Sequence, residues 1–454
     1  MDIKGFLETV CKEIKYKPAR SGIEEELKLH IQDIKEDYIK NGMQETEAEE
    51  KAVSQMGNAE EIGKKLNKIH KPKLDWKLLI LIAILVGFGI AISILKQQTT
   101  HISYLGNTII YILISMVLGT IVYFFDYRKL KSCSNIIYLI ASILMIMPLI
   151  PGIGFTINGR YCIRFLSCSF FPHTIAVPLY IISFIGYITN YNKENTIKIT
   201  TTKHEIATNK GILKILAFSI LSLILTINTS IVNAMILGVI YLIIITAKII
   251  KSREKRLKKL GIIYGIIGIF ALVIISVIII NPYAYRLDRI TYSFKPQIDP
   301  QGGYTGMLQK EVLENAKIIG EAETEIISSD EFIISKESNY TFIYLIGKMG
   351  IILSGILVLT IILTSIKLIL NAKVIKDQYG KFLIIGLSAL YIFQSIASVL
   401  MNINLGIKTD IDLPFVTYGG TYLIINTISI AIILSIYRRK NINVYDEKFE
   451  EQCH

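Results

Sequence analysis

The sequence has few cysteines and little charge for its length. Of its 454 residues, 5 are cysteine and 19% are charged, against about 25% charged in an average soluble protein. The cysteines lack the close spacing of metal ligands, so they exclude a disulfide-rich secreted fold and predict no metal site, while a need for a divalent metal is left open. Acids are scarcest: residues 1–75 hold 16 of the 37, and the other residues carry 21 acids against 35 bases. This distribution excludes one large soluble domain and a disordered tail protein.

Long apolar runs fill the part of the chain where acids are scarce. A helix needs about 20 apolar residues to cross about 30 Å of hydrocarbon. Ten such runs lie at 77–96, 107–125, 134–151, 171–190, 211–228, 230–248, 260–280, 340–368, 382–402 and 418–437. Each is predicted to be a helix, because the runs lack the alternation of barrel strands and lipid cannot satisfy free backbone groups. The predicted fold is therefore an all-α membrane protein. Ten transmembrane helices occupy residues 75–440, between a cytosolic helical module in 1–74 and a cytosolic tail in 441–454.

Lysine and arginine gather in alternate connections between these runs. The basic connections contain Arg128, Lys129 and Lys131; Lys251 to Lys259; Lys373, Lys376 and Lys381; and Arg438, Arg439 and Lys440. By the positive-inside rule this side is cytosolic, so both termini are predicted inside and the connections 152–170 and 281–339 outside. The formal net charge of +12 then follows from topology and requires no nucleic acid. Because residues 1–20 are charged, the first span is expected to direct insertion without a cleaved signal peptide.

Cys162 and Cys168 share the predicted outside connection 152–170. They could form a disulfide there, and two free thiols are the alternative. We favour free thiols, because cysteine is often only a small buried hydrophobic residue.

Residues 1–74 have the pattern of three or four short helices. Apolar residues recur at the spacing of a helix face, namely Ile23, Leu27, Ile31, Ile34 and Tyr38 in one helix and Ile62, Leu66 and Ile69 in another. Asn41-Gly42 and Met56-Gly57 are predicted to end helices, and Asn58 to cap the next. The stretch from His30 to Ile62 resembles the small helical prefix domain before some Gram-positive permeases, which is associated with sensing and partner proteins. A solvated bundle without chemistry is the alternative, with His30 and His70 on its surface.

The most specific motif is Leu413-Pro414-Phe415-Val416-Thr417-Tyr418-Gly419-Gly420-Thr421, at the start of the last run. A proline, two aromatic residues and a glycine pair at a membrane boundary predict a broken backbone, which is tolerated only where it lines protein or a wet cavity. The string resembles the LPF(I/V)SYGG signature of the SEDS family (FtsW, RodA and SpoVE), glycosyltransferases of the bacterial plasma membrane that polymerise lipid II into peptidoglycan. The resemblance implies structural roles for Pro414, Phe415, Tyr418, Gly419 and Gly420.

Further segments carry the same resemblance, which extends over about residues 77–440. The family pattern YRxxRI…F…P…DP…GxGYQ is similar to one stretch of this chain. That stretch is Tyr285-Arg286-Leu287-Asp288-Arg289-Ile290, followed by Phe294, Pro296, Asp299-Pro300 and Gly303-Tyr304. Asn158-Gly159-Arg160 and Arg164 resemble NGARRWI, and Gln394 stands where the family has Gln. Ten spans with both ends inside and a large outside loop also match the family.

The resemblance implies a reaction in which a sugar hydroxyl displaces undecaprenyl diphosphate from the anomeric carbon of lipid II. Such a reaction needs a carboxylate to accept the hydroxyl proton and cations to hold the diphosphate. Asp299 is the implied catalytic base, and Arg160, Arg164, Arg286 and Arg289 are implied contacts for the diphosphate or head group. A plain turn at Asp299 and interfacial anchoring by the arginines are the alternatives. The implied partners are lipid II, membrane lipid and a class B penicillin-binding transpeptidase.

Lys348 is a further candidate for substrate binding. It lies about two turns into the eighth apolar run, where an unpaired charge costs about 2.5–3.5 kcal/mol on insertion scales. A charge retained at that cost indicates function, unless the side chain reaches the membrane surface.

The sequence departs from the family at four motifs. The family's QPSExxK is replaced by Phe171-Pro172-His173-Thr174-Ile175-Ala176-Val177. Its QPDLGTA is replaced by Asn228-Thr229-Ser230-Ile231-Val232-Asn233-Ala234. The acid of TDFIF is replaced by Asn339, and Pro-Val-Thr-Gly by Lys408-Thr409-Asp410. The lost acids and lysine leave a second function open, that of a non-catalytic scaffold or sensor of cell-wall machinery. A third function is a flippase for lipid-linked precursors, which the near absence of ionisable residues in the runs disfavours.

Overall fold

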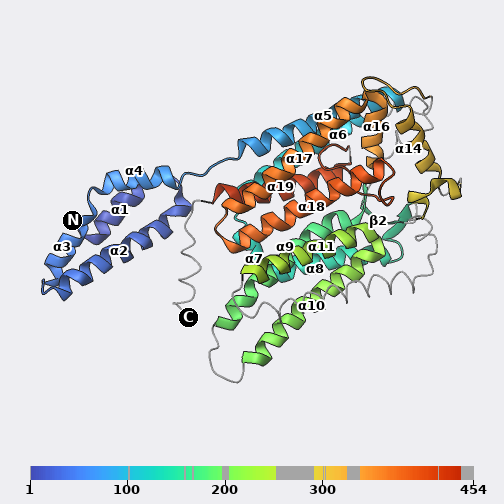
Figure 1. Cartoon of the computed structure of the whole chain (residues 1–454). Coiled ribbons are helices and arrows are strands. Elements are labelled where there is room, and N and C mark those ends of the chain that lie inside the picture. Colours follow the sequence, from blue (N-terminus) through green and yellow to red (C-terminus); the bar gives the residue numbers. More distant parts are fainter. Residues whose placement is uncertain are drawn as a thin grey trace. The chain divides into compact units, whose positions relative to one another are not determined.

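The computed structural model describes residues 2–100, 103–157, 160–165, 168–196, 204–251, 291–299, 301, 303–324, 338–417 and 419–440 (Figure 1). The chain divides into two compact units. One unit consists of Met1–Asp75 with Val374–Asp377 and the chain from Ile436, and the other of Trp76–Lys373 and Gln378–Ser435. Each unit has its own buried apolar residues.

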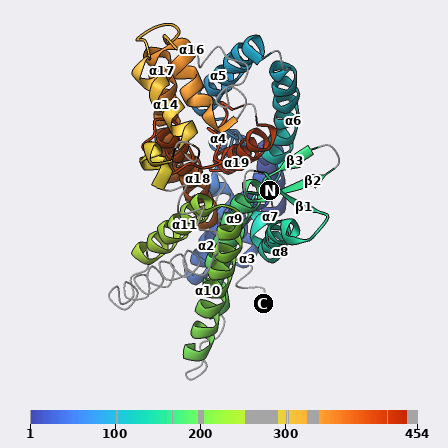
Figure 2. The same ribbon diagram turned by 90° about the vertical axis from the view of Figure 1, so that its right-hand side faces the viewer.

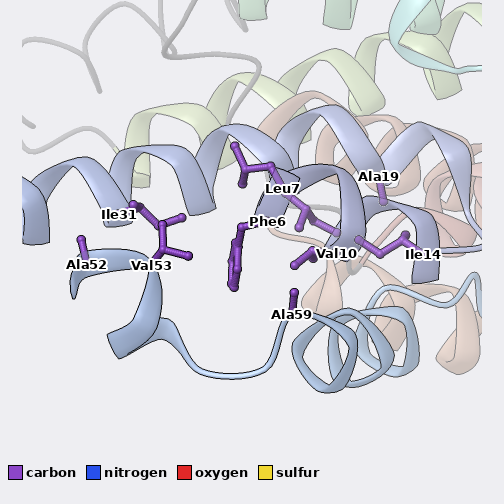
Figure 3. Close-up of a cluster of buried hydrophobic side chains, with 10 residues drawn as sticks. Phe6, Leu7, Val10, Ile14, Ala19, Ile31, Ala52, Val53 and Ala59 are labelled. Atoms are coloured by element: carbon purple, nitrogen blue, oxygen red, sulfur yellow. The ribbon is translucent and has the colours of Figure 1, made fainter. Parts of the chain in front are cut away.

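The first unit is a bundle of short helices. Its elements are α1 (Ile3–Glu13), η1 (Lys17–Ala19), α2 (Arg20–Lys40), α3 (Glu45–Met56) and α4 (Ala59–Ile69). Their apolar faces meet in one core, made of Phe6, Leu7, Val10, Ile14, Ala19, Ile23, Ile31, Ala52, Val53 and Ala59 (Figure 3). The predicted face of α2 supplies Ile23 and Ile31 to this core, with Leu27 and Ile34 partly buried against it. These residues thus form short helices around a small apolar core.

The ends of these helices follow the predicted caps. The Asn58 side chain accepts hydrogen bonds from the amides of Glu60 and Glu61 at 2.9 and 3.3 Å, as an N-cap does. Gly42 and Gly57 both have φ of +89°, a conformation that favours glycine after a helix. The predicted surface position is confirmed for His30 but is wrong for His70, which is only 6% exposed. His70 is the C-cap residue of α4 and lines a hollow together with Leu27, His30 and Leu66.

The second unit contains the membrane spans. Seven described helices are long and apolar enough to cross a membrane: α5 (Trp76–Thr100), α6 (Tyr104–Phe124), α9 (Pro172–Thr196), α11 (Ile231–Lys251), α17 (Ile351–Val374), α18 (Gln378–Asn402) and α19 (Gly420–Arg438). Shorter apolar stretches occupy Ser134–Leu149, which is α8 (Ser134–Ile146) with η2 (Met147–Leu149), and the end of α10 (His204–Thr229). A five-residue helix, α7 (Arg128–Ser132), precedes α8. The predicted run 260–280 lies outside the described residues, so the count of ten spans stays a prediction.

The spans differ in how far other helices enclose them. In α9, 78% of the most apolar 18-residue segment is buried inside the protein, whereas in α6 the buried share of the corresponding segment is 17%. Polar side chains on α9 therefore face protein, where each one needs a partner.

The predicted run 340–368 is not one helix. It divides at Gly350 (φ +87°) into the short buried helix α16 (Thr341–Met349), which follows η5 (Ser338–Tyr340), and the spanning helix α17. The amides of Ile351 and Ile352 donate to the carbonyls of Lys317 and Ile318 at 3.0 and 3.2 Å. The carbonyls of a neighbouring loop thus accept hydrogen bonds from backbone amides that have no helical partner at the break. The prediction of a span beginning at residue 340 is wrong because apolar composition does not reveal such a break.

The predicted connection 152–170 contains a small antiparallel sheet in the order β1 (Gly154–Ile157), β2 (Arg160–Phe165) and β3 (Cys168–Phe170). Figure 2 shows it beside α8 and α9. Cys162 is opposite Phe155, whereas Cys168 is opposite Phe165, three residues further along β2. That offset is about 10 Å along a strand, beyond the Cα separation of a disulfide. Cys162 is buried and carries a thiol that is not part of a disulfide, as the sequence analysis favoured.

Candidate functional site

The backbone is broken at the predicted motif before α19. Phe415 has φ of +66° and is buried, in a turn at residues 414–416. The two glycines that follow leave no room for a side chain. A Cβ on Gly419 would lie 2.5 Å from Asp412 Oδ2, and one on Gly420 would lie 2.5 Å from the ring of Tyr111 in α6. Pro414 and Phe415 are thus confirmed as part of a buried, non-helical turn, while Tyr418 lies outside the described residues.

A buried ionisable pair lies next to this motif. His173, at the start of α9, places Nε2 2.7 Å from Asp410 Oδ2, and their side chains are 0% and 5% exposed. The other carboxylate oxygen of Asp410, Oδ1, accepts hydrogen bonds from Ser230 and Thr409 at 3.3 Å each. Asp410 thereby joins the start of α9, the junction of α10 and α11, and the segment before α19.

Asparagines extend these contacts toward α16 and α18. Asn233 Nδ2 donates to Ser230 Oγ at 3.0 Å, and Asn339 Nδ2 donates to the carbonyl of Thr409 at 3.0 Å. Asn402, at the end of α18, donates to the carbonyl of Asn339 and accepts from the amide of Ile343. We call this set the polar network: His173, Ser230, Asn233, Asn339, Asn402, Thr409 and Asp410. All of its members are buried.

The loop that carries Asp299 is folded and attached beside the polar network. Asp299 follows η3 (Pro296–Ile298); its Oδ1 accepts from the amide of Gln301 at 3.0 Å and its carbonyl from that of Gly303 at 2.7 Å. The turn leads into α14 (Tyr304–Glu314). The Asp299 carboxylate is therefore held in one orientation, and the residue is partly exposed.

Hydrogen bonds of Gln309, Asn404 and Lys408 fasten this loop to residues 401–408. Gln309 Nε2 donates to the carbonyl of Met401 at 3.2 Å, Asn404 Nδ2 to that of Gly306 at 2.8 Å, and the amide of Lys408 to Ser293 Oγ at 2.9 Å. The structure thus brings the Asp299 loop, the polar network and the last motif together at one end of the bundle.

Comparison with known proteins identifies this arrangement. Residues 72–442 match the profile of the FtsW/RodA/SpoVE family, described as cell cycle protein. The chain belongs to this family. The match covers most of the chain, including every segment of the site described above.

Several members of the family are similar over most of their length. A probable peptidoglycan glycosyltransferase FtsW from Nitrosomonas europaea is 25% identical, over 82% of this chain and 94% of its own. Stage V sporulation protein E of Bacillus subtilis is 24% identical, over 71% of this chain and 84% of its own.

Two solved structures share the fold. RodA of Thermus thermophilus has a TM-score of 0.53 at 14% identity, covering 81% of this chain and 97% of its own. A chain of a peptidoglycan synthase complex that coordinates polymerization and crosslinking has a TM-score of 0.59 at 16% identity, covering 81% and 98%. The SEDS-type helical bundle predicted from the sequence is therefore confirmed.

Within this FtsW/RodA/SpoVE family member, the four departures from the family pattern meet in the polar network. His173 stands in the QPSExxK segment, Ser230 and Asn233 in the QPDLGTA segment, Asn339 in place of the TDFIF acid, and Asp410 before the last motif. Sequence reasoning treats these positions as separate losses. In the structure the replacement residues contact one another.

The remaining predicted site residues are Arg160, Arg164, Arg286, Arg289 and Lys348. Arg164 is exposed on β2, with its guanidinium 4.8 Å from the ring centroid of Phe155, and Arg160 begins the same strand. Arg286 and Arg289 lie outside the described residues. Lys348 forms an ion pair with Glu321 at the end of α16, before the spanning helix α17 begins. The interpretation of Lys348 as an unpaired charge inside a span is therefore wrong.

Two lysines of this family member escaped sequence reasoning. Lys96, near the end of α5, is fully buried, with its ammonium 5.2 Å from the ring centroid of Tyr344. Lys408 is partly buried beside Asn404. Lys96 belongs to no motif, and Lys408 stands in the segment that replaces Pro-Val-Thr-Gly, where the family pattern has no lysine. A lysine at the end of an apolar run, such as Lys96, is usually a surface anchor. Among the described residues, no group of three or more His, Cys, Asp or Glu side chains is placed to hold a metal ion.

Proposed function

We propose that this protein is a membrane glycosyltransferase that polymerises lipid II into peptidoglycan strands during cell division, elongation or sporulation. The observation that carries the proposal is the family match over residues 72–442, because it includes the Asp299 loop and the last motif. Relatives named as probable peptidoglycan glycosyltransferases support the same reaction.

Asp299 is the proposed base. It accepts the proton of the attacking sugar hydroxyl while the bond between the anomeric carbon and the diphosphate oxygen breaks. The carboxylate is partly exposed, so a substrate hydroxyl can reach it, and the bond from Gln301 orients it. A positioned base contributes typically 10²- to 10⁴-fold to the rate. Arg160, Arg164, Arg286 and Arg289 are the proposed contacts for the head group.

The proposed orientation places both termini in the cytosol and the Asp299 loop outside, where the sugars of lipid II would be presented. The basic connections support it by the positive-inside rule. A class B penicillin-binding transpeptidase is the proposed partner. The likeness to a chain of a peptidoglycan synthase complex supports that partnership.

The test is polymerisation of purified lipid II by the full chain with its transpeptidase partner. Asp299→Ala should abolish polymer without lowering membrane abundance, because only the proton acceptor is lost. Glu314→Gln, on the exposed surface of α14, is the matched control and should polymerise as the wild type does. Polymer from Asp299→Ala would refute the catalytic role. A wild type that binds lipid II but never extends glycan would instead indicate the scaffold or sensor function.

A further inference from the structure

Lys408 differs from Lys310, Lys317 and Lys348 in having no carboxylate partner among the described residues. Lys310 and Lys317 pair with Glu314 and Glu323 at 3.6 and 2.8 Å, and Lys348 pairs with Glu321. Among the described residues, no carboxylate lies within 4 Å of Lys408 Nζ. Its ammonium donates to the amide oxygen of Asn404 at 2.8 Å and lies 5.9 Å from the ring centroid of Tyr340.

The position of Lys408 is fixed from both sides. Its own amide donates to Ser293 Oγ on the loop that carries Asp299. The next two residues, Thr409 and Asp410, belong to the polar network and are held through Ser230 and His173. The ammonium is therefore presented between the Asp299 loop and the buried network.

Within the part of the chain that the structure describes, this partly buried ammonium has no acidic side chain within 4 Å, which is unusual for a lysine. Desolvation lowers the pKa of Lys408 to about 7 from its ordinary value of 10.5. An anion at this position would compensate the charge. A diphosphate is suited to it, because an ammonium binds phosphate oxygens as a compact point charge.

We propose that Lys408 binds the diphosphate group of the lipid-linked substrate and supplies a cation that the QPSExxK segment of this chain lacks. This inference rests on the proposed function and assigns the charge that stabilises its leaving group. The Asp299 loop and Lys408 would then serve the two sides of one reaction. Asp299 takes the hydroxyl proton, and Lys408 holds the departing diphosphate.

Other ionisable groups surround Lys408 and must be separated from it in a test. They are Lys295, Asp299, Tyr304, Lys310, Glu311 and Glu314 on the loop and α14; Tyr340 and Lys348 on η5 and α16; and His173, Asp410 and Asp412 near the polar network. A Lys408→Arg variant keeps a cation there at every accessible pH, while all these other groups stay in place. The binding affinity of the wild type divided by that of Lys408→Arg, followed across pH, therefore isolates the titration of Lys408.

The experiment measures binding of farnesyl diphosphate to the full chain in phosphatidylcholine nanodiscs. Lys408→Met should weaken binding about tenfold, the amount expected for one charged hydrogen bond, and Lys408→Arg should retain most of it. Between pH 6 and pH 8.5 the wild type should lose affinity relative to Lys408→Arg. Lys310→Met, an exposed lysine on α14, is the matched control and should bind as the wild type does.

Several outcomes would overturn the inference. Wild-type affinity in Lys408→Met, or an equal loss in Lys310→Met, would exclude a specific site. A ratio of wild-type to Lys408→Arg binding affinity that stays constant across the pH range would also exclude a specific site. This comparison does not depend on whether Lys408→Met folds. Equal binding of farnesyl monophosphate, or displacement by phosphatidylglycerol in the disc, would assign the site to general phospholipid. None of these binding measurements requires polymerisation. Failure of the proposed function would therefore be seen in a different experiment, in which the wild type makes no glycan from lipid II.

Discussion

Nε2 of His173 lies 2.7 Å from Oδ2 of Asp410, and both side chains are buried at one end of the helical bundle. The pair joins α9 to the segment before α19, and Ser230 adds the junction of α10 and α11. Ionisable groups in such a setting are costly unless they are paired and hydrogen-bonded. The pair lies where the four segments that differ from the family pattern meet, and we expect this end of the bundle to depend on it.

His173→Ala should destabilise the protein by roughly 3 kcal/mol, because it leaves the Asp410 carboxylate buried without its nitrogen partner. The double variant His173→Ala with Asp410→Ala removes both members of the pair and should lose less than the two single variants, His173→Ala and Asp410→Ala, together. Thermal unfolding in detergent, analysed as a double-mutant cycle, measures the coupling. Strictly additive losses would contradict a direct pair.

Gly420→Ala should destabilise the protein by about 1–3 kcal/mol through overpacking, because the new methyl group would meet the ring of Tyr111 at 2.5 Å. Gly355→Ala in α17 is the control, since a Cβ there meets nothing within 4 Å. Adding Tyr111→Leu to Gly420→Ala should restore part of the loss in thermal stability. Equal melting temperatures for the two alanine variants would disprove the close approach.

Asn58→Ala should remove the cap of α4 and cost about 1 kcal/mol, because the amides of Glu60 and Glu61 lose their acceptor. Hydrogen exchange on the full chain should show faster exchange in the first turn of α4. The amides of α2 serve as an internal control and should keep their protection. Unchanged exchange in α4 would mean that the cap contributes nothing.

Lys408 should make stability depend on pH. Because its pKa is lowered to about 7 in the folded protein, the unfolded chain binds more protons between pH 7 and about 10.5, so the free energy of unfolding rises with pH in that interval. Lys408→Met should lack this contribution, and the advantage of the wild type should grow as pH rises from 7 to 9.5. Thermal unfolding of both proteins across that range provides the measurement. A difference in thermal stability between wild type and Lys408→Met that stays constant from pH 7 to 9.5 would contradict the lowered pKa of Lys408.

Much of the fold follows from local sequence. Asn58, Gly42 and Gly57 mark helix ends because capping depends on a few neighbouring residues, and apolar length marks the spans. The break at Gly350 was missed because the carbonyls that satisfy it belong to Lys317 and Ile318, which no local pattern connects to α17. The short strands in 154–170 were missed for the same reason.

The site was predictable in part. The family motifs indicated Asp299 and the turn at Phe415, since each lies within a recognisable string. His173, Asp410 and Lys408 were not identified as partners, because they lie up to about 240 residues apart and only folding brings them together.

The most direct test of the central claim is the single-turnover rate of lipid II coupling at saturating substrate, in wild type and Asp299→Asn. The account predicts a rate lower by about 10²- to 10⁴-fold with the apparent affinity for lipid II unchanged, because the amide keeps the shape of the carboxylate and cannot accept the proton. A wild-type rate in Asp299→Asn would contradict it.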